Sequence, residues 1–279
     1  MRVISLLVRP LLIAVVSASS MLGLLRAAHA EMSNWAENEG GRMRLVALPP
    51  DADGHIRAGL QIEPKPGWIT YWREPGNNGI PPQITIVPQS GVTLDAISYP
   101  VPKYISRGKV EDIGYDAPVT LPLSLTASKA GPVAIDATAF IGICKDICIP
   151  FQAQLLLKFE AVAQSRPQEE MILRDAAARL PEAPTADFKV VAHAVSSDLK
   201  QLSLKITLPE AGGGTPDIVA TGPSGYAFTK QTNIGRSGNA YSTDITIGKL
   251  PKNYDIRGKQ WGVLVIDGTR AMETTLAFD

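Results

Sequence analysis

From Arg42 onward the sequence is divided into short apolar or alternating runs, and this rhythm constrains the fold more than any other feature. Each run has the length of a β-strand and is bounded by Gly, Pro, Asp or Asn, which is typical of the strands of a β-sandwich. The 24 Gly and 22 Pro residues favour turns over long helices. Strands are expected at residues 43–47, 55–62, 68–72, 119–125, 133–141 and 154–159, and in a second group at residues 188–195, 202–208, 218–221, 241–247, 261–266 and 272–278.

Residues 165–180, between the two groups, depart from this rhythm and indicate a helix. Ser165 and Gln168 have capping-box spacing, and Pro181 ends the segment. The apolar residues of one helical stripe are Ile172, Leu173, Ala176, Ala177 and Leu180. We therefore predict an all-β protein of two immunoglobulin-like β-sandwich domains joined by a short helix. The expected boundaries are residues 31–163 for the first sandwich, 164–186 for the helical linker and 187–279 for the second sandwich.

Residues 1–30 have the pattern of a secretory signal peptide. Arg2 and Arg9 precede an apolar run at residues 11–25, and Ala28-His29-Ala30 fits the small-x-small cleavage rule. The run is shorter than the ~20 apolar residues of a membrane-spanning helix. We expect cleavage after Ala30, which gives a mature protein in the periplasm with no membrane span.

The charge balance excludes one large class of function. The chain has 27 basic and 27 acidic residues, and three of the basic ones lie within residues 1–30. The remainder has a small acidic excess and no basic run, whereas nucleic-acid binding depends on neutralising phosphates. We therefore expect no nucleic-acid partner.

The only cysteines, Cys144 and Cys148, are four residues apart. In an exported chain such a pair is expected to form a disulfide. An extended strand would hold their Cα atoms ~13 Å apart, whereas a disulfide needs about 4.4–6.8 Å. The chain must therefore reverse at residues 145–147, with the cysteines opposite each other at the end of a hairpin.

The short spacing also bears on what the bond is for. Closing a five-residue loop removes only ~2 kcal/mol of unfolded-state entropy, against about 4.7 kcal/mol for a 100-residue loop. Thiol–disulfide exchange, a local clamp of the hairpin and a metal pair all stay open. A metal is the weakest of the three, because the histidines outside residues 1–30, His55 and His193, are far from the pair in sequence. The spacing also differs from the C-x-x-C of thioredoxin, which stands at a helix amino terminus.

Several strings, in this order, resemble one family. They are residues 66–82 (PGWITYWREPGNNGIPP), Tyr99-Pro100, Gly114-Tyr115, residues 119–123 (VTLPL) and Cys144-x-x-x-Cys148-Ile-Pro150. Together they are similar to the periplasmic amino-terminal region of the protein-disulfide reductase DsbD and of its relative, the suppressor-of-copper-sensitivity protein B. These motifs span residues 57–150, and the later strands are compatible with the family but unspecific.

The resemblance implies an immunoglobulin-like domain that exchanges disulfides with thioredoxin-fold proteins. By this resemblance Cys148 forms the mixed disulfides, Cys144 resolves them, and residues 103–111 form a cap in which Tyr104 shields the pair. Better-known members separate the cysteines by five residues, whereas this chain separates them by three. Full-length members continue into a membrane domain and a thioredoxin-like domain, and this sequence ends at Asp279 with neither. We therefore expect a separate membrane electron carrier.

The sequence thus predicts a periplasmic thiol–disulfide relay that acts as a protein-disulfide reductase without a cofactor or metal. The alternative is a β-sandwich binding or chaperone module whose disulfide only stiffens a hairpin. A copper-tolerance role through the thiols is suggested by the family name alone.

Overall fold

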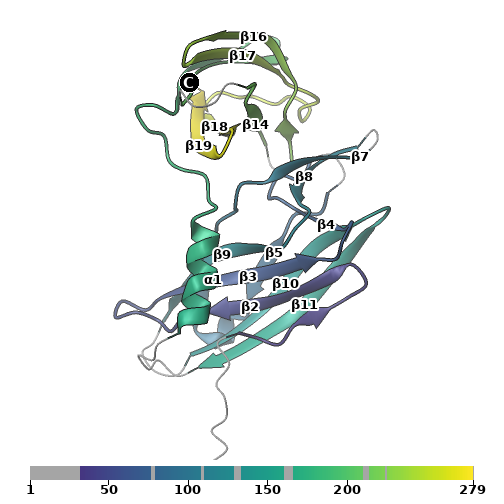
Figure 1. The fold of residues 1–279 in the computed structure, drawn as a ribbon, viewed down its shortest axis with the longest axis vertical. Helices are drawn as coiled ribbons and strands as arrows, with labels where there is room; N and C mark the ends of the chain where they lie inside the picture. Colours follow the sequence, from purple (N-terminus) through teal and green to yellow (C-terminus); the bar gives the residue numbers. More distant parts are fainter. Residues whose placement is uncertain are drawn as a thin grey trace, which may run out of the picture.

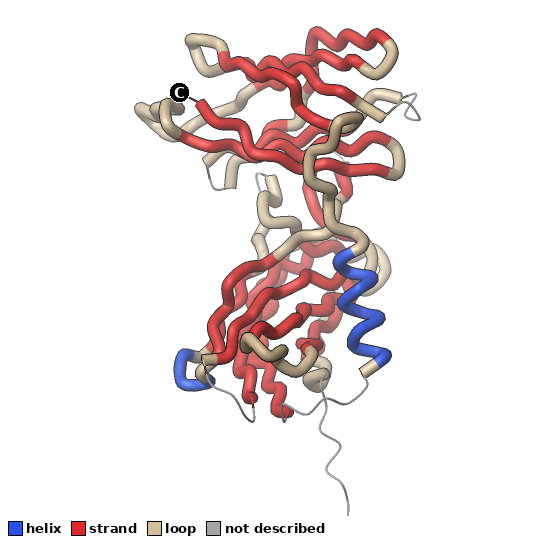
Figure 2. Tube along the Cα trace, turned by 90° about the vertical axis from the view of Figure 1, so that its left-hand side faces the viewer, coloured by secondary structure: helices blue, strands red, loops and turns tan. Residues whose placement is uncertain are grey.

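The computed structural model describes residues 32–76, 79–107, 110–128, 133–159, 166–209, 214–223 and 225–278. These residues form two β-sandwich blocks stacked along the long axis of the molecule, with one helix along the side of the first block (Figures 1 and 2). The predicted all-β, immunoglobulin-like class is confirmed. The predicted signal peptide lies outside the described residues. Within the described ranges, no helix is long and apolar enough to cross a membrane.

The first block consists of two antiparallel sheets. One sheet has the order β1-β2-β3-β9-β6, from Ala36–Glu37, Gly41–Ala47, His55–Pro64, Val119–Ala127 and Val92–Ile97. The other has the order β11-β10-β4-β8-β7, from Cys148–Phe159, Val133–Cys144, Ile69–Tyr71, Val110–Tyr115 and Lys103–Arg107, and β5 (Gln83–Ile86) also pairs with β10. A short 3-10 helix, η1 (Pro88–Ser90), precedes β6.

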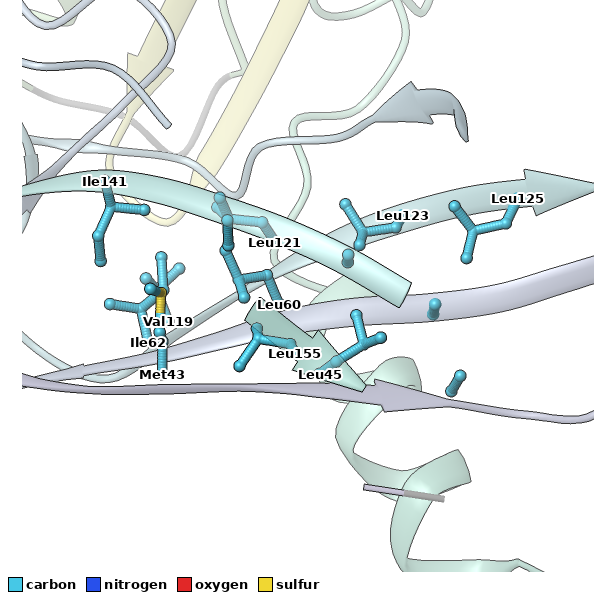
Figure 3. Packing of buried hydrophobic residues seen from close by; sticks show 14 of the residues in the cluster. Met43, Leu45, Leu60, Ile62, Val119, Leu121, Leu123, Leu125, Ile141 and Leu155 are labelled. Atoms are coloured by element: carbon cyan, nitrogen blue, oxygen red, sulfur yellow. The ribbon is translucent and has the colours of Figure 1, made fainter. Parts of the chain in front are cut away.

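Alternating residues of these strands form the core between the two sheets. One sheet contributes five inward-pointing side chains, those of Met43, Leu45, Leu60, Ile62 and Leu121 (Figure 3). Strands β10 and β11 of the other sheet contribute inward-facing side chains such as Ile141 and Leu155. All of these side chains are at most 2% exposed. The period-2 pattern of the sequence therefore reports a sheet with one buried face.

The second block is also a sandwich of two antiparallel sheets. Their orders are β12-β13-β17-β16, from Lys189–Val195, Gln201–Thr207, Ala240–Thr246 and Gln231–Ser237, and β15-β14-β18-β19, from Ala227–Phe228, Asp217–Thr221, Lys259–Asp267 and Arg270–Phe278. Trp261, Phe188 and Met272 lie among the buried residues between them.

The helix α1 (Pro167–Ala177) packs on the first block instead of standing free between the blocks. Its Leu173 is 5% exposed and contacts Val46 and Leu48. Ser165 of the predicted capping box lies outside the described residues. The N-cap residue is Arg166, which makes no side-chain cap hydrogen bond. Pro167 alone marks the start, since a proline in the first turn needs no N–H partner.

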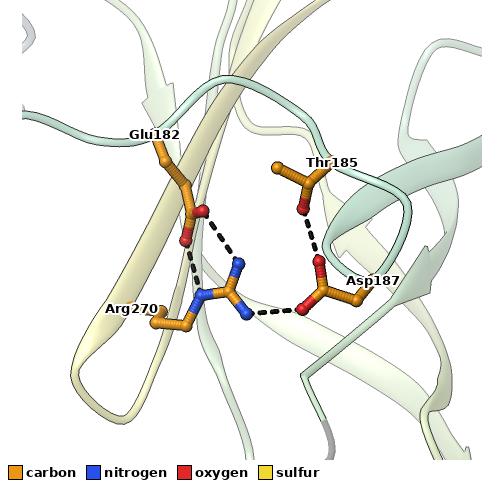
Figure 4. Close-up of polar contacts among 4 residues, drawn as sticks. All are labelled: Glu182, Thr185, Asp187 and Arg270. Carbon is orange, nitrogen blue, oxygen red and sulfur yellow. Dashed lines mark hydrogen bonds and ion pairs between the residues drawn. The ribbon is translucent and has the colours of Figure 1, made fainter.

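The segment after the helix attaches to the second block through Arg270. The guanidinium of Arg270 donates to both carboxylate oxygens of Glu182, at 2.7 and 2.8 Å, and to Asp187 at 2.6 Å (Figure 4). Thr185 donates to the other oxygen of Asp187 at 2.7 Å. Backbone hydrogen bonds join Glu182 to Ala271 and Glu273 of β19.

The blocks also share apolar contacts. Val219, Leu264 and Ala271 of the second block belong to the same buried cluster as the core of the first block. The two sandwiches are therefore packed together and not only connected by the chain.

Candidate functional site

The cysteines lie at the closed end of the longest hairpin in the described structure. β10 and β11 pair in register over twelve residue pairs that end at Cys144 opposite Cys148. The reversal predicted at residues 145–147 is confirmed, and a disulfide joins the two cysteines, whose Cα atoms are 4.1 Å apart.

The two sulfur-bearing residues differ completely in exposure. Cys144 is 0% exposed, because β10 is covered on one side by β11 and on the other by β4, where Ile69 stands opposite Cys144. Cys148 is exposed, because it begins the edge strand β11. The turn residues between them are also exposed, and the Ile147 side chain is 70% exposed. An approaching molecule thus meets Cys148 and Ile147 first.

Tyr71 on β4 is the polar neighbour of the exposed cysteine. Its hydroxyl lies 3.3 Å from Sγ of Cys148, and because a disulfide sulfur carries no hydrogen, the hydroxyl is the donor. The Tyr71 residue is 1% exposed. Tyr71 lies in the cluster with Ile69 and Cys144, whereas Trp68 and Trp72 pack in the main core on the other face of the strand. The contact of Tyr71 with sulfur is not among the features predicted from the sequence.

Two glycines make room for the Tyr71 ring. A β-carbon at Gly79 would lie 2.6 Å from Cδ1 of the ring, and one at Gly142 would lie 3.1 Å from Cδ2. A side chain at either position would displace the ring. Gly79 and Gly142, the latter two residues before Cys144, therefore leave the space that the Tyr71 ring occupies beside the sulfur.

The shielding of the buried cysteine differs from the prediction. Ile105 of β7 packs against the cluster of Ile69, Tyr71 and Cys144, whereas the neighbouring Tyr104 points to the other face of the strand and packs against the main core. The Tyr104 hydroxyl donates to the carbonyl of Ile218 in the second block at 2.8 Å. The residues of the expected cap that the structure describes, 103–107 and 110–111, belong to the antiparallel ribbon of β7 and β8.

Beside Cys148, only a short stretch of the edge strand β11 has backbone groups that could pair with another chain. Pro150 pairs with Gly142, and a proline can stand in a ladder only where the N–H direction faces away from the neighbouring strand. The backbone N–H of residue 148, two positions earlier, points in the same direction as the N position of Pro150. The distance between the Cα atoms of the two cysteines, 4.1 Å, is also near the ~4.5 Å of a non-hydrogen-bonded pair in an antiparallel ladder. The backbone N–H and C=O of Cys148 therefore face outward, and Pro150 offers no N–H beyond them.

Neither histidine lies at this site. His55 is near Thr126, 3.4 Å from its hydroxyl, and His193 in the second block contacts the Ala277 carbonyl at 2.8 Å. No group of three or more His, Cys, Asp or Glu residues able to hold a metal occurs in the described part of the chain. The chemical groups at this site are the two cysteine sulfur atoms and the Tyr71 hydroxyl, which donates to one of them.

Comparisons with known proteins agree with this geometry. Residues 43–160 match the family described as "Thiol:disulfide interchange protein DsbD, N-terminal". The chain is also similar to the solved N-terminal periplasmic domain of ScsB from Proteus mirabilis, with a TM-score of 0.72 and 21% sequence identity over 89% of this chain and 99% of that one. No curated protein matches the sequence. The part of the chain that carries the cysteine pair, residues 43–160, is therefore similar in sequence to DsbD amino-terminal domains, and the chain as a whole shares the fold of the ScsB domain.

Proposed function

We propose that the chain relays reducing equivalents in the periplasm, by thiol–disulfide exchange between a separate electron donor and thioredoxin-fold partners. The observation that carries this proposal is the pairing of an exposed Cys148 with a fully buried Cys144. A clamp of a hairpin needs no such difference, whereas exchange needs one accessible sulfur and one that is protected from other thiols.

The reaction runs in two balanced steps. The Cys148 thiolate attacks the disulfide of an oxidised partner, so that an interchain S–S bond forms and one partner sulfur leaves as a thiolate. Cys144 gives up its proton and attacks Sγ of Cys148, which forms the Cys144–Cys148 disulfide and releases the second partner sulfur. Two electrons pass to the partner, whose two thiols take up the protons. A dithiol donor of the thioredoxin fold reverses these steps and reduces the pair.

The surroundings of Cys148 suit such a partner. The Tyr71 hydroxyl, already donating to Sγ, would stabilise the thiolate that attacks, since hydrogen bonds to charged groups are the stronger ones. The exposed Ile147 offers an apolar contact next to the reacting sulfur. The outward-facing N–H and C=O of Cys148 offer the backbone pairing by which an extended segment docks at a sheet edge.

The test is capture of a partner by single-cysteine variants. The probe is a thioredoxin-fold protein that keeps only its exposed active-site cysteine, activated as a mixed disulfide with an aromatic thiol. Cys144→Ser is expected to form a stable interchain disulfide on a non-reducing gel, and Cys148→Ser is expected to form almost none. Both variants should stay folded, because the five-residue loop contributes only ~2 kcal/mol.

Two results would contradict the proposal. Equal capture by both variants would remove the assignment of Cys148 as the exchanging residue. No capture by either variant, together with a wild-type disulfide that thioredoxin-fold donors cannot reduce before unfolding, would show that the bond is a structural clamp.

A further inference from the structure

A cavity of about 390 Å³ lies where the two blocks and the end of the helix meet. Its walls come from three separate parts of the chain: from within residues 100–103 and 115–119 of the first block, from residues 178–180 at the end of α1, and from within residues 266–271 around the turn between β18 and β19. Figure 1 shows that α1 ends at this junction. The volume falls within the range of about 300–1,000 Å³ that is typical of small-molecule pockets.

Most of the lining residues of this cavity are apolar. Tyr115, Val119 and Ala271 line it and are buried in the protein, and Leu180 adds apolar surface from the end of the helix. The Tyr115 hydroxyl already donates to the carbonyl of Pro100 at 2.8 Å, so its proton needs no further partner. An apolar group that displaced water from such a surface would gain free energy.

The charged residues of the wall are mainly basic. Three of the lining residues are Lys103, Arg179 and Arg270, and the acidic one is Asp116. Lys103 pairs with Asp116 at 2.8 Å, and Arg270 is held by the two carboxylates described above. Arg179 is exposed and has no ion-pair partner among the described residues. The cavity therefore carries one unpaired positive charge, which favours a ligand with one negative charge.

Backbone hydrogen bonds fix Arg179 at the edge of the cavity. Its N–H donates to the carbonyl of Ala176 at 3.2 Å, and its carbonyl accepts from the N–H of Val101 at 2.9 Å. A smaller hollow of about 190 Å³ lies beside α1, and Pro118, Val119 and Arg179 line both hollows. Arg179 thus stands where the two hollows adjoin, and an anion bound there could extend an apolar chain into the larger one.

We propose that this cavity binds a small amphiphilic carboxylate, with the anionic group at Arg179 and the apolar chain against Tyr115, Val119 and Ala271. A guanidinium matches the planar carboxylate group with two parallel hydrogen bonds. One unpaired cation also favours a carboxylate over a doubly charged phosphate. No lining residue belongs to the cysteine site, so the proposal does not rest on thiol–disulfide exchange.

The test is calorimetric titration of the purified chain with octanoate and with its neutral analogue octanamide. Octanoate is expected to bind saturably, with one molecule per chain. Octanamide should bind about five-fold more weakly because it lacks the charge, and five-fold is near the upper end for an exposed ion pair. Saturating octanoate should also raise the urea midpoint, since a ligand that binds only the folded state stabilises it.

Three variants locate the ligand. Arg179→Gln should lower the affinity for octanoate to that for octanamide and leave octanamide binding unchanged. Arg174→Gln, on the same helix, removes an exposed arginine that lines neither hollow, and it should leave both affinities unchanged. Ala178→Phe fills the cavity from an exposed lining position and should abolish binding of both compounds.

Three results would overturn the proposal. The first is the absence of saturable octanoate binding to the wild-type chain. The second is an equal loss of octanoate affinity in Arg179→Gln and Arg174→Gln, since binding would then follow overall charge. The third is octanoate binding that survives Ala178→Phe, which would place the ligand elsewhere. None of these measurements involves a thiol, so this proposal and the proposed function can fail separately.

Discussion

Cys144 and Cys148 are paired residues of one hairpin, yet only one of them can be reached from solvent. The difference comes from sheet order, because Cys144 ends a strand with neighbours on both sides and Cys148 begins an edge strand. Tyr71 adds a chemical difference, since its hydroxyl contacts the exposed sulfur. At the scale of single residues, the site is thus already divided into an exposed and a protected position.

Tyr71→Phe should slow exchange at Cys148. The variant keeps the buried ring between Gly79 and Gly142 but removes the donor to Sγ, and a hydrogen bond to a charged group is worth about 1.5–3 kcal/mol. We expect attack by Cys148 on a model disulfide at neutral pH to be roughly 10-fold slower or more, measured with Cys144→Ser in a stopped-flow assay. Tyr115→Phe, which loses a hydrogen bond to the Pro100 carbonyl, is the matched control. An unchanged rate in Tyr71→Phe would mean that the hydroxyl does not act on the thiolate.

Part of this residue-level picture could be predicted and part could not. The spacing of the cysteines required a chain reversal at residues 145–147, because no extended chain brings their Cα atoms close enough. The contact of Tyr71 with sulfur depends on β4 lying beside β10, a pairing between segments some 70 residues apart that local patterns do not contain. Tyr104 was singled out as a shield, but strand alternation gives the contact with the cysteine cluster to Ile105.

At the scale of elements, strands with one buried face were predictable and the ribbon was not. The alternating run at residues 119–125 became part of β9, with Val119, Leu121, Leu123 and Leu125 buried. β7 lacks such alternation because both of its faces are used, one through Ile105 against the cluster of Ile69, Tyr71 and Cys144 and the other through Tyr104 against the second block. A segment covered on both faces by distant parts of the chain carries no period-2 signal.

The helix is an element whose packing could be tested directly. Leu173 fills the contact between α1 and the first sandwich, with Val46 and Leu48 as neighbours. Leu173→Ala should lower the free energy of unfolding by about 2–4 kcal/mol, the cost of a cavity in a packed contact. Met171→Ala on the same helix, where the side chain is 48% exposed, should cost under about 1 kcal/mol. Urea unfolding followed by circular dichroism would give the free energy of unfolding of both variants. Equal losses in the two variants would mean that α1 does not pack on the sheet through Leu173.

At the scale of the whole molecule, the junction between the blocks contains charged groups that make its stability depend on pH. Arg270 holds the pKa of Asp187 at about 2, below the usual 3.8, mainly through its hydrogen bond, and it also lowers the pKa of Glu182. Carboxyls with lowered pKa values stabilise the folded state above their unfolded-state pKa. That contribution is lost as pH falls through the folded-state value.

Removing Arg270 should therefore flatten the acid dependence of stability. In wild type, the contribution of Asp187 to stability fades between pH 3.8 and about 2. In Arg270→Met the hydrogen bond from Thr185 remains, so the pKa of Asp187 is lowered less and the loss of stability with falling pH is smaller. The measurement is the urea midpoint at pH 6 and at pH 3 for both proteins. Arg57→Met, which removes an exposed arginine from β3 in the first block, serves as the control and should keep the wild-type difference. If the urea midpoint of Arg270→Met falls between pH 6 and pH 3 as much as that of wild type, this network is excluded as a source of acid sensitivity.

Pro150 has a kinetic consequence for any protein that docks beside Cys148. A partner segment can pair with the backbone of residue 148, but the missing N–H two residues later interrupts the ladder before the remaining nine residues of β11. The non-covalent affinity for a partner would then stay low, so the lifetime of the complex would be set by the interchain disulfide. Once that bond is resolved, the partner would dissociate quickly, and one chain could serve many partners in succession.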